Sequence, residues 1–138
     1  FELWGSYNPN SIIFKEIDKE VRDDPRIRIM GPAPDDKIIE IYDSFDVFFF
    51  PTKEEGFGLP VIEAQARGIP VIVFKDSRIP QEVCELCIKI NHDLPDLDYI
   101  ISFRENNYLK LSEFSRKFSI ENEIKRLSTV YSYITSSL

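Results

Sequence analysis

The chain has 138 residues, of which 43% are hydrophobic, and carries a formal net charge of −7 at pH 7. This length suits one domain, residues 1–138, with a single substantial core, and the apolar content argues against intrinsic disorder. The acidic balance argues against a nucleic-acid-binding protein, which needs a basic face. Apolar runs such as VFFF fall far short of the ~20 residues that a transmembrane segment needs.

Five segments in the first part of the chain alternate between strand and helix patterns. Residues 1–6 are predicted to form a short strand, and residues 10–24 a helix with one apolar face. A strand is predicted over 26–31, where it ends at a glycine and a proline. Residues 34–45 are predicted to form a helix that is capped by one of its aspartates and buries Ile38, Ile39, Tyr42 and Phe45. The apolar run in 46–51 indicates a strand that is covered on both faces.

The second part of the chain continues this alternation. A helix is predicted over 60–68 and a strand, again covered on both faces, over 69–74. A short helix over 78–85 and a strand over 87–91 are expected to follow. The remainder is predicted to be helical, with a short helix from about Asp96 and a longer helical segment broken near Phe118 and Ser119.

Apolar strands that alternate with amphipathic helices predict an α/β fold, here a Rossmann-like parallel sheet of about five strands with helices on both faces. In such a fold, ligands bind beyond the carboxyl ends of the strands. The chain begins with phenylalanine rather than methionine, so we expect it to be a piece of a longer protein. No signal-peptide pattern follows Phe1.

Cys84 and Cys87 form a single CxxC pair. A structural zinc site would need two more ligands, and His92 is the only histidine. A thioredoxin-type pair would begin a helix, whereas Cys87 opens the apolar segment CIKI. The favoured interpretation is therefore two reduced thiols with packing roles, with redox or metal chemistry as the alternative. This cysteine usage suits a cytoplasmic protein.

Residues 51–74, PTKEEGFGLPVIEAQARGIPVIVF, contain three of the five glycines of the chain. Pro60 is expected at the first helical position, where its missing N–H costs nothing. The amides near Gly58, Leu59 and Val61 would then be free to bind an anion, above all phosphate. Gly56 and Gly58 would allow positive φ and the close approach of a ligand.

Two glutamates flank this predicted phosphate site. Glu55 precedes the loop, and Glu63 is expected in the first turn of the following helix. Carboxylates repel phosphate but accept hydrogen bonds from paired sugar hydroxyls, so the combination suits a nucleotide sugar. The alternatives are that Glu63 is a solvated residue favoured by the helix dipole and that Phe57 packs as a plug on the core.

The segment EGFGLPVIE, from Glu55 to Glu63, resembles the E-x7-E signature of retaining glycosyltransferases of the GT-B fold, in particular family 4. Upstream, RIRIMGPAPDDKIIEIYDSFDVFFFPT resembles the segment that leads into this signature. Downstream, ARGIPVIVF and IPQEV resemble its continuation. FSIENEIKRLSTVY is similar to the C-terminal helix that crosses back to the other domain. The resemblance covers nearly the whole chain and implies the C-terminal, nucleotide-sugar-binding half of a GT-B fold.

The resemblance implies a role for each matching position. Glu55 would bind hydroxyls of the donor sugar and take part in catalysis, and Glu63 would bind the ribose hydroxyls. Donor contacts are implied for seven further residues, namely Gly56, Phe57, Gly58 and Leu59 in the loop and Met30, Gly31 and Pro32 against the base. No metal and no cofactor are expected, because the fold uses positive side chains and helix dipoles to stabilise the leaving diphosphate.

Four departures from the family pattern bear on activity. The Arg and Lys that neutralise the diphosphate in the family would lie upstream of Phe1, although Lys53 and Arg78 are near enough in the predicted fold to help. The glycine-rich turn before Ile-Pro-Glu is DSRIPQEV here, and the next glycine turn is replaced by CELCIKIN. The acceptor-binding N-terminal domain is expected to lie outside this chain.

The sequence therefore predicts the donor-binding domain of a hexosyltransferase that acts with retention, and an isolated chain that transfers nothing. The alternatives are a non-catalytic nucleotide-binding or subunit-interaction module and a GT-B nucleotide-sugar epimerase. A receiver-type signalling domain is disfavoured, because FFFPT stands where its aspartate should be. Lipid-linked acceptors, and hence contact with a membrane surface, are compatible with the sequence but not required by it.

Overall fold

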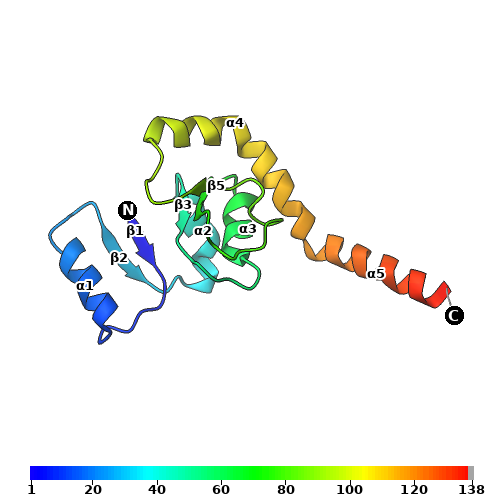
Figure 1. The fold of residues 1–138 in the computed structure, drawn as a ribbon, viewed down its shortest axis with the longest axis horizontal. Helices are drawn as coiled ribbons and strands as arrows, with labels where there is room; N and C mark the ends of the chain where they lie inside the picture. Colours follow the sequence, from blue (N-terminus) through cyan, green and yellow to red (C-terminus); the bar gives the residue numbers. More distant parts are fainter. Residues whose placement is uncertain (137–138) are drawn as a thin grey trace. The chain divides into compact units, whose positions relative to one another are not determined.

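The computed structural model describes residues 1–136, and the chain divides into two compact units, Phe1–Ile41 and Tyr42–Leu138. Figure 1 shows their elements in chain order. Every strand pairs in parallel with its neighbour, and the strands are joined through helices or turns, which confirms the predicted α/β class.

The N-terminal unit contains a small parallel sheet of two strands. Its elements are β1 (Glu2–Trp4), α1 (Ile12–Val21), β2 (Arg28–Gly31), the 3₁₀ helix η1 (Asp35–Lys37) and the start of α2 (Ile38–Asp43). Leu3 pairs with Ile29 across the sheet. Ser11 caps α1, because its hydroxyl accepts a hydrogen bond of 3.0 Å from the amide of Phe14.

The predicted helix in 10–24 is confirmed, but its apolar face is not buried. Ile12, Ile13 and Ile17 are exposed, and α1 has no buried residue. A two-stranded sheet offers too little apolar surface to cover an amphipathic helix fully. The sequence pattern therefore predicted the helix correctly but not its packing.

The C-terminal unit is built on a three-stranded parallel sheet in the order β3-β4-β5. Its elements are β3 (Phe48–Phe50), α3 (Leu59–Ala66), β4 (Val71–Phe74), β5 (Ile88–Ile90), α4 (Leu97–Ser115), the 3₁₀ helix η2 (Arg116–Phe118) and α5 (Ile120–Ser136). Phe49 pairs with Ile72, which pairs in turn with Ile88. The central strand is the most deeply buried, with Val71, Ile72 and Val73 all buried.

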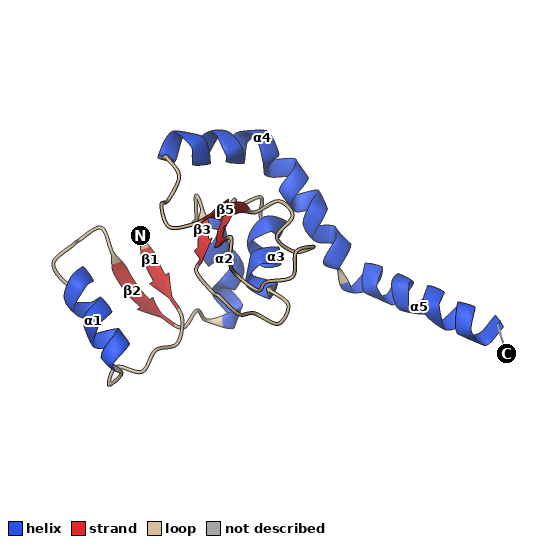
Figure 2. Ribbon diagram, in the orientation of Figure 1, coloured by secondary structure: helices blue, strands red, loops and turns tan. Residues whose placement is uncertain are grey.

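Helices cover both faces of this sheet, as predicted (Figure 2). On one face Ile72 and Ile88 form a core with Ile100 of α4. Phe48 points to the opposite face, where its ring meets that of Tyr42 at 5.7 Å. Tyr42 in turn contacts α3 through Glu63. The alternation of side chains along each strand thus places Ile100, near the start of α4, on one side and α3 on the other, while α4 also packs against α3.

Several predicted details are wrong. Within residues 1–136 the five strands form one sheet of two strands and another of three, whereas a single sheet of about five strands was predicted. Residues 34–45 begin as a 3₁₀ helix with Pro34 at the N-cap position, so no aspartate caps it, and Ile39 is 60% exposed. The strand at 46–51 is half-buried rather than covered on both faces, because β3 is an outer strand of its sheet.

Two further differences concern the segments after β4. Residues 81–86 form turns rather than the predicted helix, although Val83 is buried. The helix that begins after Asp96 is long, not short, and runs to Ser115. The break near Ser119 is confirmed, because its hydroxyl accepts from the amide of Asn122 at the start of α5.

Replacing Gly68 with alanine is expected to destabilise the C-terminal unit by about 1–3 kcal/mol. Gly68 has a φ of +71°, and a Cβ there would lie 2.2 Å from Cδ2 of Tyr108. Urea unfolding measures the loss. The double variant Gly68→Ala/Tyr108→Ala should recover the part caused by the clash, and equal losses in both variants would show that the clash contributes nothing.

Candidate functional site

The loop after β3 lies at the carboxyl edge of the three-stranded sheet, where ligands bind in α/β folds. It runs from Pro51 to Gly58 and leads into α3. The loop that follows β4 lies beside it, because the amide of Arg78 donates a hydrogen bond of 2.7 Å to the carbonyl of Lys53. The two loops therefore form one continuous edge.

Gly58 fixes the shape of this loop. It is the N-cap residue of α3 and has a φ of +88°, a left-handed conformation that favours glycine. A Cβ at this position would lie 3.0 Å from Cγ2 of Ile79 and 3.4 Å from Cγ1 of Val83. The turn segment after β4 thus packs directly against Gly58 and holds the start of α3 in place.

The free amides at the N-terminus of α3 are only partly those that the sequence predicts. The amide of Val61 donates a hydrogen bond of 3.0 Å to the carbonyl of Gly58, so it is not free. In the part of the chain that the structure describes, no hydrogen bond is recorded for the amides of Phe57, Gly58 and Leu59. These three donors, together with the helix dipole, favour an anion at this edge.

Glu55 folds back over the loop. Its carboxylate accepts a hydrogen bond of 2.9 Å from the amide of Gly56. Its Cγ lies 3.9 Å from the position that a Cβ of Gly58 would occupy. The side chain is half-buried. It is therefore held beside the turn that opens α3, and the second carboxylate oxygen carries no recorded hydrogen bond within residues 1–136.

Glu63 is exposed on α3, but in the second turn of the helix rather than the first. Leu59 is the first helical residue and Pro60 the second, so Glu63 is the fifth. Glu63 is thus exposed, as the alternative explanation expects, but it lies beyond the first turn, where the helix dipole acts most strongly. Its Oε2 instead accepts a hydrogen bond of 2.9 Å from the hydroxyl of Tyr42.

Tyr42 is the residue that sequence reasoning placed only in the core. It is buried, with 7% of its surface exposed, and burial together with the neighbouring carboxylate of Glu63 raises the pKa of its hydroxyl. The phenol therefore remains a hydrogen-bond donor. An apolar stripe with one tyrosine among aliphatic residues could have signalled a polar partner, because buried tyrosine hydroxyls generally find one.

Six of the predicted residues lie along one continuous segment, the loop and the first two turns of α3, and they are Glu55, Gly56, Phe57, Gly58, Leu59 and Glu63. Met30, Gly31 and Pro32 belong to the N-terminal unit. Gly31 ends β2 with a φ of +83°, and its carbonyl accepts from the amide of Gly5 at 2.8 Å. The contact of these three residues with a base stays a prediction.

Phe57 is not a plug on the core. Its side chain is 42% exposed, and its ring meets that of Phe118 edge-on at 6.0 Å. The loop therefore rests against η2 through one aromatic contact, while part of the ring faces solvent.

Lys53 and Arg78 lie together at this edge, as predicted, and both pair with exposed acids. Lys53 Nζ lies 3.2 Å from Asp76, and an Arg78 nitrogen lies 2.8 Å from Glu54. Such exposed pairs contribute little to stability. The two cations can therefore turn toward an anionic ligand at small cost.

The cysteine pair contacts α3 through Gln65. Both thiols are free, and a hydrogen bond between them lowers the pKa of Cys84 and raises that of Cys87. The amide nitrogen of the buried Gln65 donates to Cys87 Sγ at 3.4 Å. These contacts fit the packing roles favoured from the sequence.

None of the helices within residues 1–136 has both the length and the apolar composition that a membrane-spanning helix needs.

Residues 14–87 match the model of the family described as glycosyl transferases group 1. The match spans more than half of the chain. The chain belongs to this family. As a group 1 glycosyltransferase chain, it is 29% identical over 136 residues to a D-inositol 3-phosphate glycosyltransferase of Corynebacterium efficiens, covering 90% of this chain and 32% of that protein. It is 37% identical over 57 residues to the O-antigen chain mannosyltransferase B of Escherichia coli, covering 41% of this chain and 15% of that protein.

Solved GT-B glycosyltransferases share the fold of this group 1 chain. One is described as the GtfA/B complex, with a TM-score of 0.55, 18% identity, and coverage of 99% of this chain and 29% of that chain. Another is the pneumococcal O-GlcNAc transferase GtfA in complex with UDP and GlcNAc, with a TM-score of 0.51, 22% identity, and coverage of 88% and 24%. The chain thus spans about a third or less of the proteins that it resembles.

Proposed function

We propose that the chain is the donor-binding part of a retaining family 4 glycosyltransferase, which transfers a hexose from a nucleotide diphosphate sugar to an acceptor. The observation that carries this proposal is the arrangement at the start of α3. Glu55 and Glu63 stand before and after three amides with no recorded partner, in a chain of the group 1 family. Carboxylates that accept hydrogen bonds from sugar hydroxyls thus lie on either side of amides that donate to phosphate, all within one short segment.

Each part of the site takes one part of the donor. The amides of Phe57, Gly58 and Leu59 bind the diphosphate, whose charge the helix dipole stabilises. Glu63 accepts hydrogen bonds from the ribose hydroxyls. Glu55 accepts hydrogen bonds from the transferred sugar and orients its anomeric carbon.

The base and the cationic groups complete the proposed donor site. For the base, the resemblance implies Met30, Gly31 and Pro32, and that contact stays a prediction. No metal ion or cofactor is part of the proposal, because Lys53 and Arg78 supply positive charge for the leaving diphosphate. We place the protein in the cytoplasm, where free thiols such as Cys84 and Cys87 persist.

The acceptor site is proposed to lie outside this chain. Because the chain corresponds to 32% of the D-inositol 3-phosphate glycosyltransferase that it resembles, we assign acceptor binding to a further domain. We therefore expect the 138-residue chain to bind nucleotide diphosphates weakly and to transfer no sugar.

NMR titration of the 15N-labelled chain with UDP, GDP and ADP, and then with their glucose and mannose conjugates, tests the proposal. We expect saturable shifts at Gly58, Leu59 and Glu63 for at least one nucleotide, at millimolar or lower concentration. A chain that binds none of them contradicts donor binding. Robust sugar transfer by the isolated chain contradicts the separate acceptor domain.

Replacing both Lys53 and Arg78 with alanine is expected to weaken diphosphate binding by about 3- to 10-fold, with a larger effect at low salt. The midpoint of urea unfolding should hardly move, because both ion pairs are exposed. Lys110→Ala, on the exposed surface of α4, is the matched control. Unchanged affinity in the double variant would exclude these cations from the site.

A second candidate function is a subunit-interaction module. The exposed isoleucines of α1, Ile12, Ile13 and Ile17, favour it, since exposed apolar side chains grouped on one helix often mark an interface. If this is the function, Glu63→Ala will leave nucleotide binding unchanged, while Ile13→Lys will abolish capture of a partner. Donor binding predicts the opposite result for Glu63→Ala.

A further inference from the structure

We propose that Tyr42 is a positioning residue that orients the carboxylate of Glu63 toward the ribose hydroxyls of the donor. The inference rests on the proposed function, because Glu63 has a ligand to face only if the chain binds a nucleotide. It assigns to Tyr42 a role in donor affinity beyond its packing in the core.

The ring of Tyr42 is held firmly. It is buried, and it meets the rings of Phe45 and Phe48 edge-on at 6.0 and 5.7 Å, with interplanar angles of 80° and 81°. Edge-on aromatic pairs favour one ring orientation. The hydroxyl at the tip of the ring therefore occupies a fixed position beside α3.

That point is the carboxylate of Glu63. The hydroxyl lies 2.9 Å from Glu63 Oε2 and 3.5 Å from the carbonyl oxygen of Pro60, so the carboxylate is the better acceptor. An ionised carboxylate has about four lone-pair sites. The bond to Tyr42 occupies one site and limits rotation of the group, while the rest of the exposed carboxylate remains open to a pair of hydroxyls.

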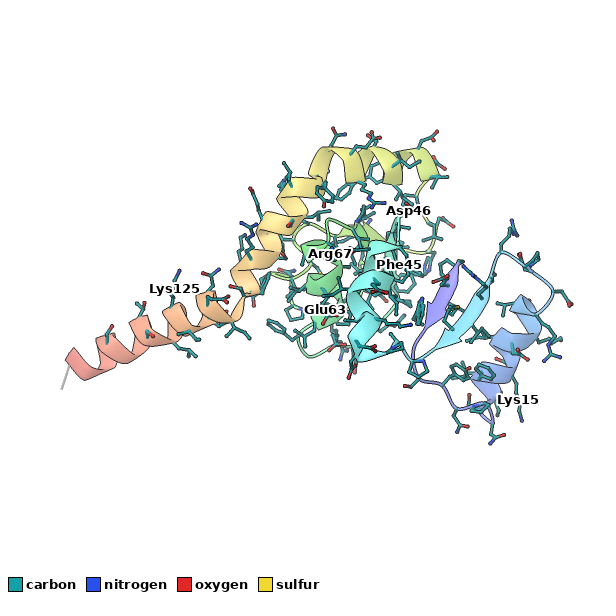
Figure 3. The ribbon with its side chains drawn as sticks, turned by 180° about the vertical axis from the view of Figure 1, so that it is seen from behind. Lys15, Phe45, Asp46, Glu63, Arg67 and Lys125 are labelled. Atoms are coloured by element: carbon teal, nitrogen blue, oxygen red, sulfur yellow. The ribbon has the colours of Figure 1, made fainter. Side chains whose placement is uncertain are left out.

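The neighbouring residue supports the same alignment. Asp43 accepts two hydrogen bonds of 2.6 Å from the guanidinium of Arg67, one turn after Glu63 on α3. Figure 3 shows Glu63 on α3, Arg67 at the C-terminal end of this helix, and Phe45 just beyond the end of α2. Two successive residues of α2 thus bind two successive turns of α3, which sets the register between Tyr42 and Glu63.

The variant Tyr42→Phe removes only the hydroxyl and keeps the buried ring. We expect the dissociation constant for UDP, GDP or ADP, whichever the wild-type chain binds, to rise about 3- to 10-fold, the effect of losing one orienting hydrogen bond. Tyr99→Phe, which removes an exposed hydroxyl on α4, is the matched control and should bind as the wild type does.

Two readouts separate positioning from a general structural effect. With the 2′,3′-dideoxy form of the same nucleotide, Tyr42→Phe should bind as the wild type does, because no ribose hydroxyl remains for Glu63 to hold. In the Glu63→Ala background, Tyr42→Phe should cause no further loss of affinity for the ribonucleotide. Equal weakening toward both nucleotides, or losses that add in the double variant, would overturn the inference.

The remaining outcomes are distinguishable from a failure of the proposed function. If Glu63→Ala weakens binding and Tyr42→Phe does not, the positioning role is wrong and the donor site stands. If the wild-type chain binds no nucleotide, or if Glu63→Ala binds as the wild type does, the donor site is wrong and the role of Tyr42 falls with it.

Discussion

Replacing Glu63 with alanine is expected to raise the dissociation constant for the nucleotide by about 10- to 100-fold, the largest single effect that the site predicts. A hydrogen bond to a charged group contributes about 1.5–3 kcal/mol, and Glu63 is proposed to accept one from each of two ribose hydroxyls. Loss of the carboxylate removes both, and water satisfies the hydroxyls only in part.

Titration calorimetry or NMR of the variant measures this change. Glu105→Ala, which removes an exposed carboxylate from α4, is the matched control for the altered charge. The 2′,3′-dideoxy nucleotide should bind the wild type and Glu63→Ala with similar affinity. A variant that discriminates against the dideoxy form as strongly as the wild type does would show that another residue holds the ribose.

Replacing Gly58 with alanine is expected to impair both stability and binding. An L-residue in the left-handed region costs about 1–2 kcal/mol, and the new Cβ would press on Ile79 at 3.0 Å. We expect a loss of about 1–3 kcal/mol in the free energy of unfolding. The loop should also shift, which moves the amides of Gly58 and Leu59 and weakens diphosphate binding by about tenfold or more.

Gly56→Ala is the matched control for this variant. A Cβ at Gly56 meets nothing within 4 Å, and its φ is not positive, so the expectation that Gly56 supplies a positive φ is wrong. Alanine also keeps the amide that donates to Glu55. The control should therefore fold and bind almost as the wild type does. If Gly58→Ala also binds normally, the diphosphate does not lie on this turn.

The alternation of strands and helices was predictable because local patterns determine it. The apolar runs before Pro51 and in residues 71–74 each predict a strand, and these strands are β3 and β4. Their parallel pairing follows from the helix between them. Burial was harder to predict, because it depends on the neighbours of each element. The two-stranded sheet β1-β2 is too small to cover the apolar face of α1. β3 is half-buried because it is an outer strand of its sheet.

The candidate site was predictable in sequence position but not in detail. The glycines, the proline and the two glutamates indicated an anion-binding turn before a helix. The start of the helix at Leu59, one residue earlier than predicted, moves Glu63 to the second turn. The bond from Tyr42 to Glu63 joins residues 21 positions apart, and it depends on how α2 meets α3, which no local pattern encodes.

A crystal structure of the chain with bound nucleotide diphosphate, obtained by soaking with UDP, GDP and ADP, tests the central claim most directly. We expect diphosphate oxygens within hydrogen-bond distance of the amides of Gly58 and Leu59, and ribose hydroxyls on the carboxylate of Glu63. A nucleotide bound at another edge of the sheet, with Glu63 facing solvent alone, would contradict the proposed donor site.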